Sequence, residues 1–326
     1  MSGYYSSTFL EYFMLASNLL IPLFVVALFM PSFITKLVSN NILAQDKYKR
    51  NHTQVADRGG IAILLIAMLS ISINSLFFKF TSTNYVALIV LALFGLFGVL
   101  DDMINIGRMS KLLIMYYCSY PLIQYATHTA LIIPGMGNVE LGIFYLQFII
   151  PTYVLVASNL VNMHSGFNGL ASGLSIIVLV SLIIKSVILG DTDNIISIAA
   201  ITGATLGFYF YEKYPASVFW GNVGSLTVGA AIGSLIVIQG FIISGFIMLI
   251  PHTINFLMYI YWKMRKYPHV KFGRDRGDGI LEVPNPLTLK WVLPYYYKVT
   301  EKQATYAMFL LTSFFCVLGI LVPGRM

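Results

Sequence analysis

Ten apolar segments alternate with short polar stretches along the chain. Most have the ~20 residues that a helix needs to cross a lipid bilayer, and Gly, Pro or charged residues separate them. The segments cover residues 9–35, 59–78, 85–100, 112–133, 141–160, 170–189, 195–211, 223–244, 245–262 and 304–322. They are continuously apolar, without the period-two alternation of a transmembrane β-barrel. The sequence therefore predicts one all-α membrane domain over residues 1–326, with about ten transmembrane helices.

The ends of two of these segments need comment. The boundary between the eighth and ninth segments, near Ser244 and Gly245, is the weakest of the ten. The first segment is too long for the apolar core of a signal peptide and lacks a basic leader. We therefore expect no cleavable signal peptide.

The composition excludes a soluble protein. Asp, Glu, Lys and Arg make up 10% of the chain, against ~25% in a typical soluble domain, and the mean hydropathy is +0.80. The two cysteines, Cys118 and Cys316, lie far apart within apolar runs. Packing rather than disulfide bonding is expected of them. A soluble enzyme, a disordered chain and a disulfide-rich secreted scaffold are all excluded.

Basic residues are concentrated on one side of the predicted bundle. Ten spans place both termini on one side and the odd-numbered loops on the other. Those loops carry 17 of the 20 Lys and Arg residues, nine of them between residues 263 and 303. Because cytoplasmic loops are rich in Lys and Arg, we expect these loops in the cytoplasm and both termini outside. A connection as long as 263–303 is uncommon without a function, which predicts a cytoplasmic substrate-binding loop there.

Two adjacent carboxylates end the third segment. Asp101 and Asp102 are followed by Asn105 and then by Lys111. Neighbouring carboxylates repel each other unless a cation lies near them. Mg²⁺ prefers such oxygen ligands, together with water and substrate phosphates. The alternative is a solvated helix end with a favourable lysine nearby.

The fifth segment ends in a stretch of asparagines and glycines. Asn159 and Asn162 lie on one helix face by their i, i+3 spacing. Two glycines, Gly166 and Gly169, lie before and after Asn168. Amide oxygens can bind a metal or a nucleobase edge, and glycines let the backbone approach a ligand. The alternative is a capped turn between helices. We expect His164, within this stretch, to be a hydrogen-bonded turn residue rather than a ligand.

Two further clusters complete the polar pattern. Phe219 and Asn222 open the eighth segment, and the small residues after them predict close helix packing. In the long loop, Arg274 and Arg276 flank Asp275 among glycines. Guanidinium groups bind phosphate oxygens in bidentate fashion, which predicts a phosphate clamp; a simple positive-inside anchor is the alternative. All four clusters fall on the same predicted face and favour a Mg²⁺-dependent site for a phosphorylated, nucleotide-linked substrate.

These motifs resemble those of the polyprenyl-phosphate N-acetylhexosamine-1-phosphate transferases. The matching residues, between about Asp57 and Arg276, are Asp101-Asp102-x-x-Asn105, Asn159-x-x-Asn162-x-x-x-Gly166-x-Asn168-Gly169-Leu170 and Phe219-x-Gly221-Asn222. The Arg274-Asp275-Arg276 sequence is similar to the Arg-His-Arg of the eukaryotic and archaeal UDP-GlcNAc:dolichyl-phosphate GlcNAc-phosphotransferases. Bacterial cell-wall members carry acids where this chain has Ser165 and Asn168, which argues against a muropeptide substrate. Asn222 departs from the metal-binding Asp of the family.

The resemblance implies a reaction and its residues. GlcNAc-1-phosphate would pass from UDP-GlcNAc to a polyprenyl or dolichyl phosphate in the membrane, with release of UMP, as the first step of lipid-linked oligosaccharide synthesis for N-glycosylation. The implied catalytic residues, acting on the lipid phosphate, are Asp101, Asp102 and Lys111, and the implied metal ligands are Asn162 and Asn222. The implied substrate-binding residues are Asp57, Asn105, Asn168, Phe219, Arg274, Asp275 and Arg276. Of these, Asn168 and Phe219 would take the uracil. The expected cofactor is Mg²⁺, with Mn²⁺ as an alternative.

A transporter of a phosphorylated or anionic solute is the alternative from another class of protein. Transporters place polar residues near the bilayer midplane and often contain internal repeats. Here the polar clusters lie at helix ends, and the sequence has no visible repeat. No nucleic-acid partner is expected. The sequence leaves open which UDP-HexNAc is used, the length of the lipid, and whether the small-residue faces form a homodimer.

Overall fold

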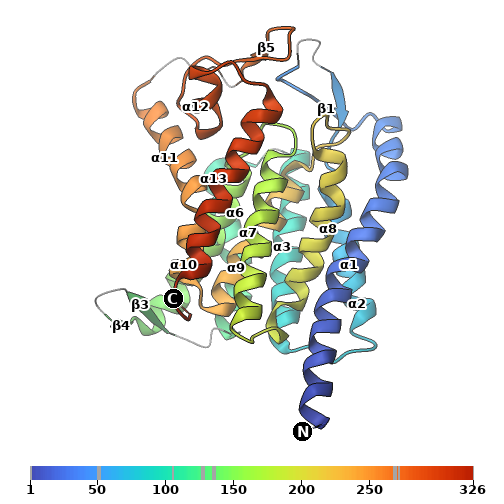
Figure 1. Cartoon of the computed structure of the whole chain (residues 1–326), viewed down its shortest axis with the longest axis vertical. Coiled ribbons are helices and arrows are strands. Elements are labelled where there is room, and N and C mark those ends of the chain that lie inside the picture. The colour runs from blue at the N-terminus through green and yellow to red at the C-terminus, as the bar shows by residue number, and fades with distance from the viewer. Residues whose placement is uncertain are drawn as a thin grey trace.

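The chain folds into a bundle of helices that run along its long axis (Figure 1). The computed structural model describes residues 2–49, 53–104, 106–125, 129–133, 137–266, 270 and 272–325. The α-helices are α1 (Ser2–Ser39), α2 (Gly60–Asn74), α3 (Ser82–Ile104), α4 (Arg108–Cys118), α5 (Gly142–Phe144), α6 (Ile150–Met163), α7 (Leu170–Ile188), α8 (Ile196–Glu212), α9 (Gly221–Gln239), α10 (Ile242–Met248), α11 (Ile250–Met264), α12 (Leu289–Tyr296) and α13 (Glu301–Leu321). Short 3-10 turns, η1 (Tyr120–Tyr125) and η3 (Asp193–Ile195), and the π-helical turn η2 (Tyr145–Ile149) join them.

Several helices can cross a bilayer. Within the described parts of the chain, six helical stretches are long and apolar enough, namely Phe9–Ser39 of α1, α3, Gly142–Met163 (α5, η2 and α6), α7, α9 and α13. The bent pair α10 and α11 would make a seventh. Helices α2 and α8 are shorter, with 15 and 17 residues. The prediction of an all-α integral membrane protein is confirmed.

The prediction of one helix over residues 112–133 is wrong. Helix α4 ends at Cys118, and η1 follows with Pro121 at its second position. Among the described residues that follow, Ala130–Ile133 form strand β3, which pairs with β4 (Gly137–Glu140) in an antiparallel hairpin. Proline has no backbone N–H and its ring clashes with the preceding turn, so Pro121 disfavours a continuous helix here, although the longer α1 tolerates Pro22 and Pro31.

The boundary predicted near Ser244 and Gly245 lies earlier, at Gly240. This glycine adopts a left-handed conformation with φ 71° and ends α9, as glycine does at many helix C-termini. The next apolar run is not one straight helix, because α10 and α11 meet at a bend of 63°. Pro251 lies in the first turn of α11, where its missing N–H costs no helical hydrogen bond.

Helix α9 lies at the centre of the bundle, and every residue from Val223 to Gln239 is buried. Glycines allow neighbouring backbones to approach it. A Cβ added at Gly229 would lie 2.6 Å from the Ser158 Cα, and one at Gly98 of α3 would lie 2.6 Å from the Val223 Cα. The close packing that the small residues predicted is confirmed. This packing brings the ends of α3, α6 and α9 together.

The two ends of the bundle differ. Strands β1 (Leu43–Gln45) and β2 (Gln54–Ala56), strands β5 (Arg274–Asp275) and β6 (Leu281–Glu282), and α12 gather at one end. The β3–β4 hairpin and both termini lie towards the other end (Figure 1). The segment that contains β5, β6 and α12 is anchored, because Leu281 and Trp291 are buried against Tyr48 and Phe167.

Candidate functional site

A cavity of about 410 Å³ opens where α3, α6, α8 and α9 end or begin. Six separate parts of the chain line it: the β1–β2 region, the end of α3, the end of α6 with the turn and the first residues of α7 that follow, the end of α8, the start of α9, and Phe272 before β5. Its lining includes Asp46, Lys47, Asp57, Asp102, Asn162, Ser165, Gly166, Phe167, Glu212, Phe219, Trp220, Asn222, Ser225 and Phe272. Of the predicted site residues, the cavity thus brings together Asp57, Asp102, Asn162, Phe219 and Asn222.

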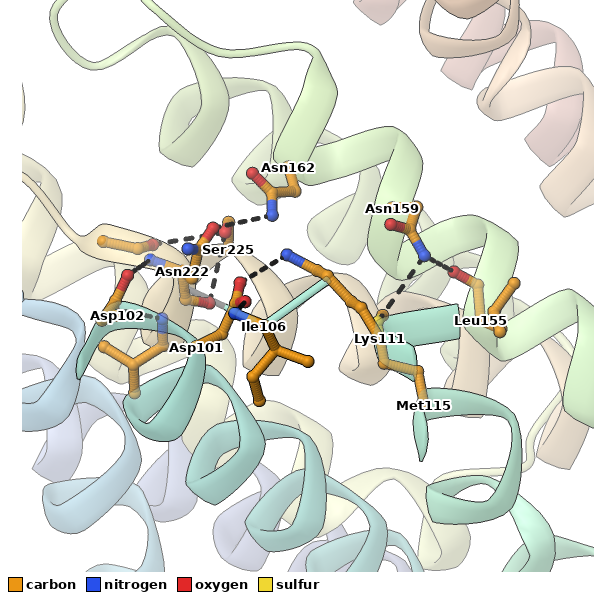
Figure 2. Close-up of polar contacts among 12 residues, drawn as sticks. Asp101, Asp102, Ile106, Lys111, Met115, Leu155, Asn159, Asn162, Asn222 and Ser225 are labelled. Carbon is orange, nitrogen blue, oxygen red and sulfur yellow. Dashed lines mark hydrogen bonds and ion pairs between the residues drawn. The ribbon is translucent and has the colours of Figure 1, made fainter. Parts of the chain in front are cut away.

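Asp102 binds the N-terminus of α9. Its two carboxylate oxygens accept hydrogen bonds from the backbone N–H groups of Asn222 at 3.0 Å and Val223 at 3.1 Å (Figure 2). The first N–H groups of a helix have no partner within the helix and carry partial positive charge, so a carboxylate there is stabilising. Arg58 donates to the Asp102 backbone carbonyl at 2.7 Å. Asp102 therefore both lines the cavity and fixes the helix that carries Asn222.

Asp101 has a different environment. Its carboxylate forms an ion pair with Lys111 at 2.6 Å and accepts a hydrogen bond from the Ile106 N–H at 3.1 Å. Asp101 is buried, and the described residues that line the cavity do not include it. The pair Asp101–Lys111 joins the end of α3 to α4 beside the cavity (Figure 2). Asn105, between them in the sequence, lies outside the described residues.

Asn162 and Asn222 meet at the cavity. The Asn162 side-chain amide donates to the Asn222 amide oxygen at 2.9 Å (Figure 2). Asn159 points elsewhere, because its amide donates to the Leu155 carbonyl at 2.9 Å. The end of α6 therefore presents one asparagine to the cavity, and that residue contacts the other predicted metal ligand.

The turn after α6 also contains His164, which was expected to be hydrogen-bonded. The structure instead buries its ring against that of His252, with 4.8 Å between ring centroids. Neither nitrogen of either ring has a hydrogen-bond partner among the described residues. The expectation of a hydrogen-bonded turn residue is therefore wrong.

Asn168 lies behind the cavity wall rather than on it. Its side-chain amide donates to Asp46 at 3.1 Å, and its amide oxygen accepts from the Ala216 N–H at 3.0 Å. Its own backbone N–H donates to Glu301 at 2.7 Å. In this structure the side chain of Asn168 joins three distant segments, while its neighbour Phe167 reaches the cavity.

The remaining predicted residues of the cavity are Phe219 and Asp57. The Phe219 N–H donates to the Ala56 carbonyl at 2.8 Å, which fixes the strand that leads into α9. Phe219 lies in a lining that also contains Phe167, Trp220 and Phe272. Burial raises the pKa of Asp57; the backbone of Arg58 opposes this rise, and the negative charge of Asp102 adds to it. The cavity thus combines aromatic walls with closely spaced carboxylates.

A second, basic cavity of about 650 Å³ adjoins the first. Its lining contains Lys47, Lys49, Arg274, Arg276, Asp275, Glu282, Phe272 and Gly273, and it shares Lys47 and Phe272 with the first cavity. Arg274 forms an ion pair with Glu282 at 2.7 Å. Asp275 accepts from the Gly277 and Gly279 N–H groups at 2.8 and 3.0 Å, so its carboxylate holds the turn between β5 and β6.

Several charged residues at the site escaped the sequence analysis. Glu212 lines the first cavity, and Lys47 lies where the two cavities join. Lys49, which lines the second cavity, forms an ion pair with the buried Glu301. A signal for both acids was available, because Glu212 directly follows the apolar segment 195–211 and Glu301 lies three residues before the segment 304–322. Lys47 and Lys49 had no such signal within a generally basic loop.

The oxygen atoms of the first cavity fit a hard divalent cation. The described residues include no group of three His, Cys, Asp or Glu that could hold a metal ion. Amide oxygens of Asn162 and Asn222, however, share the cavity with the carboxylates of Asp57, Asp102 and Glu212. Carboxylate and amide oxygens are the ligands of Mg²⁺ rather than of soft metals.

Comparison with known proteins gives one consistent result. Glycosyl transferase family 4 matches residues 84–240. A Saccharolobus solfataricus protein named as a UDP-N-acetylglucosamine–dolichyl-phosphate N-acetylglucosaminephosphotransferase is 30% identical over 89% of this chain and 90% of its own. A Sulfolobus acidocaldarius protein with the same name is 33% identical over 63% of this chain and 64% of its own. A phospho-N-acetylmuramoyl-pentapeptide-transferase of Clostridium kluyveri is 30% identical over 55% of this chain and 60% of its own. The chain therefore belongs to glycosyl transferase family 4.

Proposed function

We propose that this protein transfers GlcNAc-1-phosphate from UDP-GlcNAc to a polyprenyl phosphate of the dolichyl type and releases UMP. This would be the first step of lipid-linked oligosaccharide synthesis for N-glycosylation. The names of the two archaeal relatives support the assignment. The observation that carries it is the single cavity that joins Asp102, Asn162 and Asn222 and opens beside a basic cavity.

The reaction is a phosphoryl transfer. An oxygen of the lipid phosphate attacks the β-phosphorus of UDP-GlcNAc and forms a new P–O bond. The bond between the β-phosphorus and the oxygen that bridges to the α-phosphorus breaks, and UMP leaves with that oxygen and its electron pair. Such transfers need little covalent chemistry from the protein, and most of the acceleration comes from alignment and charge stabilisation.

The charges of the two cavities support a requirement for Mg²⁺. Among the described residues, the first cavity is lined by the carboxylates of Asp46, Asp57, Asp102 and Glu212 and by the single cation Lys47. A diphosphate would be repelled there without a further positive charge. A bound Mg²⁺ would neutralise charge on the diphosphate and orient it. Asn162 and Asn222 would hold the ion through their amide oxygens, with a carboxylate of the cavity nearby.

The residues of the chain itself would then act as follows. Phe219 would stack on the uracil, since an aromatic face binds a base without needing a hydrogen-bond partner. Lys47 would hold phosphate oxygens where the two cavities join, and Arg276 would hold them within the second cavity. Arg274 would bind phosphate as well, after leaving its ion pair with Glu282. That ion pair is exposed and therefore weak. Asp101 and Lys111 would position the lipid phosphate at the corner of α3 and α4.

An apolar groove fits the lipid chain. It has a volume of about 360 Å³ and an almost entirely apolar lining from η2, α6, α10 and α11. Leu160 lies in this groove, and Asn162, two residues later, lines the first cavity, so α6 passes along both the groove and the cavity. A polyprenyl chain in the groove would bring its phosphate to the end of α6. The 63° bend between α10 and α11 shapes one wall.

We infer a topology of ten passes. The shorter helices α2 and α8, and the segment of α4 and η1, would cross together with the six long stretches and the bent pair α10–α11. The end of the bundle that contains both cavities would face the cytoplasm, because its loops are rich in Lys and Arg. Both termini would then lie outside, in agreement with their position at the other end of the molecule (Figure 1).

A direct assay tests the function. Purified protein in detergent, given a polyprenyl phosphate and Mg²⁺, should release UMP from UDP-GlcNAc, and the reaction should stop when EDTA is added. A panel of UDP-sugars, including UDP-GalNAc, identifies the sugar. Omission of the lipid phosphate is the control for simple hydrolysis. Absence of lipid-dependent UMP release from every UDP-HexNAc would refute the assignment.

A further inference from the structure

Glu212 is a cavity carboxylate that the proposed mechanism does not yet use. It is the last residue of α8 and has only 5% of its surface exposed, yet it lines the first cavity. One carboxylate oxygen accepts a hydrogen bond from the Trp220 N–H at 3.2 Å, immediately before α9. The other, Oε2, has no hydrogen-bond donor among the described residues, although the Ser172 hydroxyl lies near enough to favour its charge.

Two other carboxylates of the cavity are better compensated. Asp46 accepts from Asn168 at 3.1 Å and lies 3.8 Å from the Lys49 ammonium. Asp102 accepts two backbone N–H groups at the start of α9. Glu212 has no ion-pair partner in the described part of the chain, and the negative charge of Asp57 acts on it as well. A buried charge without compensation is costly, so a cation in the cavity would relieve it.

The two amides at the same cavity lack the negative charge that Glu212 carries. Asn162 and Asn222 offer oxygen ligands but no charge, and a divalent cation is held much more weakly by neutral ligands alone. Glu212 and Asn222 are close in the structure, because Glu212 holds Trp220 at the start of the helix that carries Asn222. One cavity thus contains the carboxylate of Glu212, at the end of α8, and the amide oxygens of Asn162 and Asn222. Together these groups supply both the negative charge and the neutral oxygen ligands that a divalent cation needs.

We propose that Glu212 supplies the negative charge of a divalent-cation site whose amide ligands are Asn162 and Asn222. This inference rests on the proposed function and adds a residue to it. Asn222 then needs no formal charge of its own, because the charge comes from the neighbouring helix.

Metal binding without substrate tests this assignment. Free Mn²⁺ can be titrated by electron paramagnetic resonance against purified protein in detergent. Glu212→Gln keeps the acceptor for the Trp220 N–H and removes only the charge, and it should raise the Kd for Mn²⁺ by about 10-fold or more. Adding Asn222→Asp to this variant returns a charge to the site and should bring the Kd back to within about threefold of the wild-type value. Glu140→Gln, at the other end of the molecule, is the matched control and should leave the Kd unchanged.

Thermal unfolding gives a second measurement. Without divalent cations, Glu212→Gln should melt at or above the wild-type temperature, and Mg²⁺ should stabilise only the wild type. The proposal is overturned if the wild type binds no Mn²⁺, if Glu212→Gln binds it unchanged, or if Asn222→Asp does not restore binding. A Glu212→Gln protein that fails to fold would also overturn it, since Glu212 would then be a structural residue. Lipid-dependent UMP release by the wild type shows separately whether the proposed function stands.

Discussion

Lys49 and Glu301 lie 252 residues apart in the sequence and form an ion pair of 2.5 Å. Their side chains are only 19% and 4% exposed, and Glu301 also accepts the Asn168 N–H. The pair thus joins the β1–β2 region, the turn after α6 and the start of α13 beside the second cavity, which Lys49 lines. It holds together three parts of the chain on which the site depends.

Removing one partner of this pair should destabilise the protein. Lys49→Met leaves the buried Glu301 carboxylate without its cation, which costs about 3 kcal/mol in comparable buried pairs. We expect a clearly lower melting temperature in detergent. The double variant Lys49→Met with Glu301→Gln should recover part of the loss. Lys302→Met, next to Glu301 but exposed, should melt like the wild type; equal losses in both lysine variants would contradict the prediction.

Asp102→Asn should reduce UMP release by a factor of at least ~100, the low end for loss of a catalytic group. It should also cost about 1 kcal/mol of stability, because the neutral side chain no longer places a charge at the α9 N-terminus. Turnover and melting temperature are measured on the same preparation. Wild-type turnover would remove this carboxylate from the mechanism, and an unchanged melting temperature would remove it from the helix end.

Arg276→Ala should weaken UDP-GlcNAc binding while the protein remains folded. The side chain lines the basic cavity, and a charge-assisted contact with phosphate contributes about 1.5–3 kcal/mol, or roughly 10- to 100-fold in Kd. Isothermal titration with UDP-GlcNAc measures the change. Lys298→Ala is the matched control, since this exposed lysine lies in the same segment outside the described lining of that cavity. Equal affinities of the two variants would leave Arg276 as a membrane anchor only.

Lys290 should make stability depend on pH. Its ammonium donates to the Ser165 carbonyl and lies 5.5 Å from the centre of the Phe167 ring. Burial lowers the pKa of Lys290 to about 8, from 10.5. The folded-state pKa lies below the unfolded one, so the unfolded chain binds more protons between these values. The free energy of unfolding should therefore rise with pH from about 8 to about 10.5, by at most about 3 kcal/mol.

The pH effect of Lys290 is isolated by comparing two variants. Lys290→Arg stays charged throughout this pH range, and Lys290→Met stays neutral. The melting temperature of the wild type should rise relative to both as the pH increases from 8 to 10. Parallel pH profiles of all three proteins would show that the lysine remains protonated in the folded state.

The sequence located most of the site because its residues lie where apolar segments end. Asp57, Asp102, Asn162, Phe219 and Asn222 all follow or precede such a segment, and the predicted topology put these helix ends on one face of the bundle, where the structure gathers them at one cavity. The sequence could not separate the roles of Asp101 and Asp102. Successive residues of a helix point about 100° apart, so one carboxylate faces Lys111 and the other faces α9.

Long-range contacts explain what the sequence left undetermined. The position of Asn168 depends on Asp46, which is 122 residues away and sits in a stretch without a distinctive pattern. The prediction of a helix over 112–133 was wrong because it followed the apolar composition of this segment and disregarded Pro121 within it. The boundary at Gly240 was missed for the same reason, since apolar residues continue on both sides of the glycine.

The two hydrogen bonds from α9 to Asp102 carry one further consequence. Here the side chain at position 102 also fixes the most enclosed helix of the bundle. A change at that position would disturb both tasks simultaneously, so new activities of this scaffold should arise first through the segment that contains β5 and β6, where Arg274 and Arg276 lie outside the helix bundle.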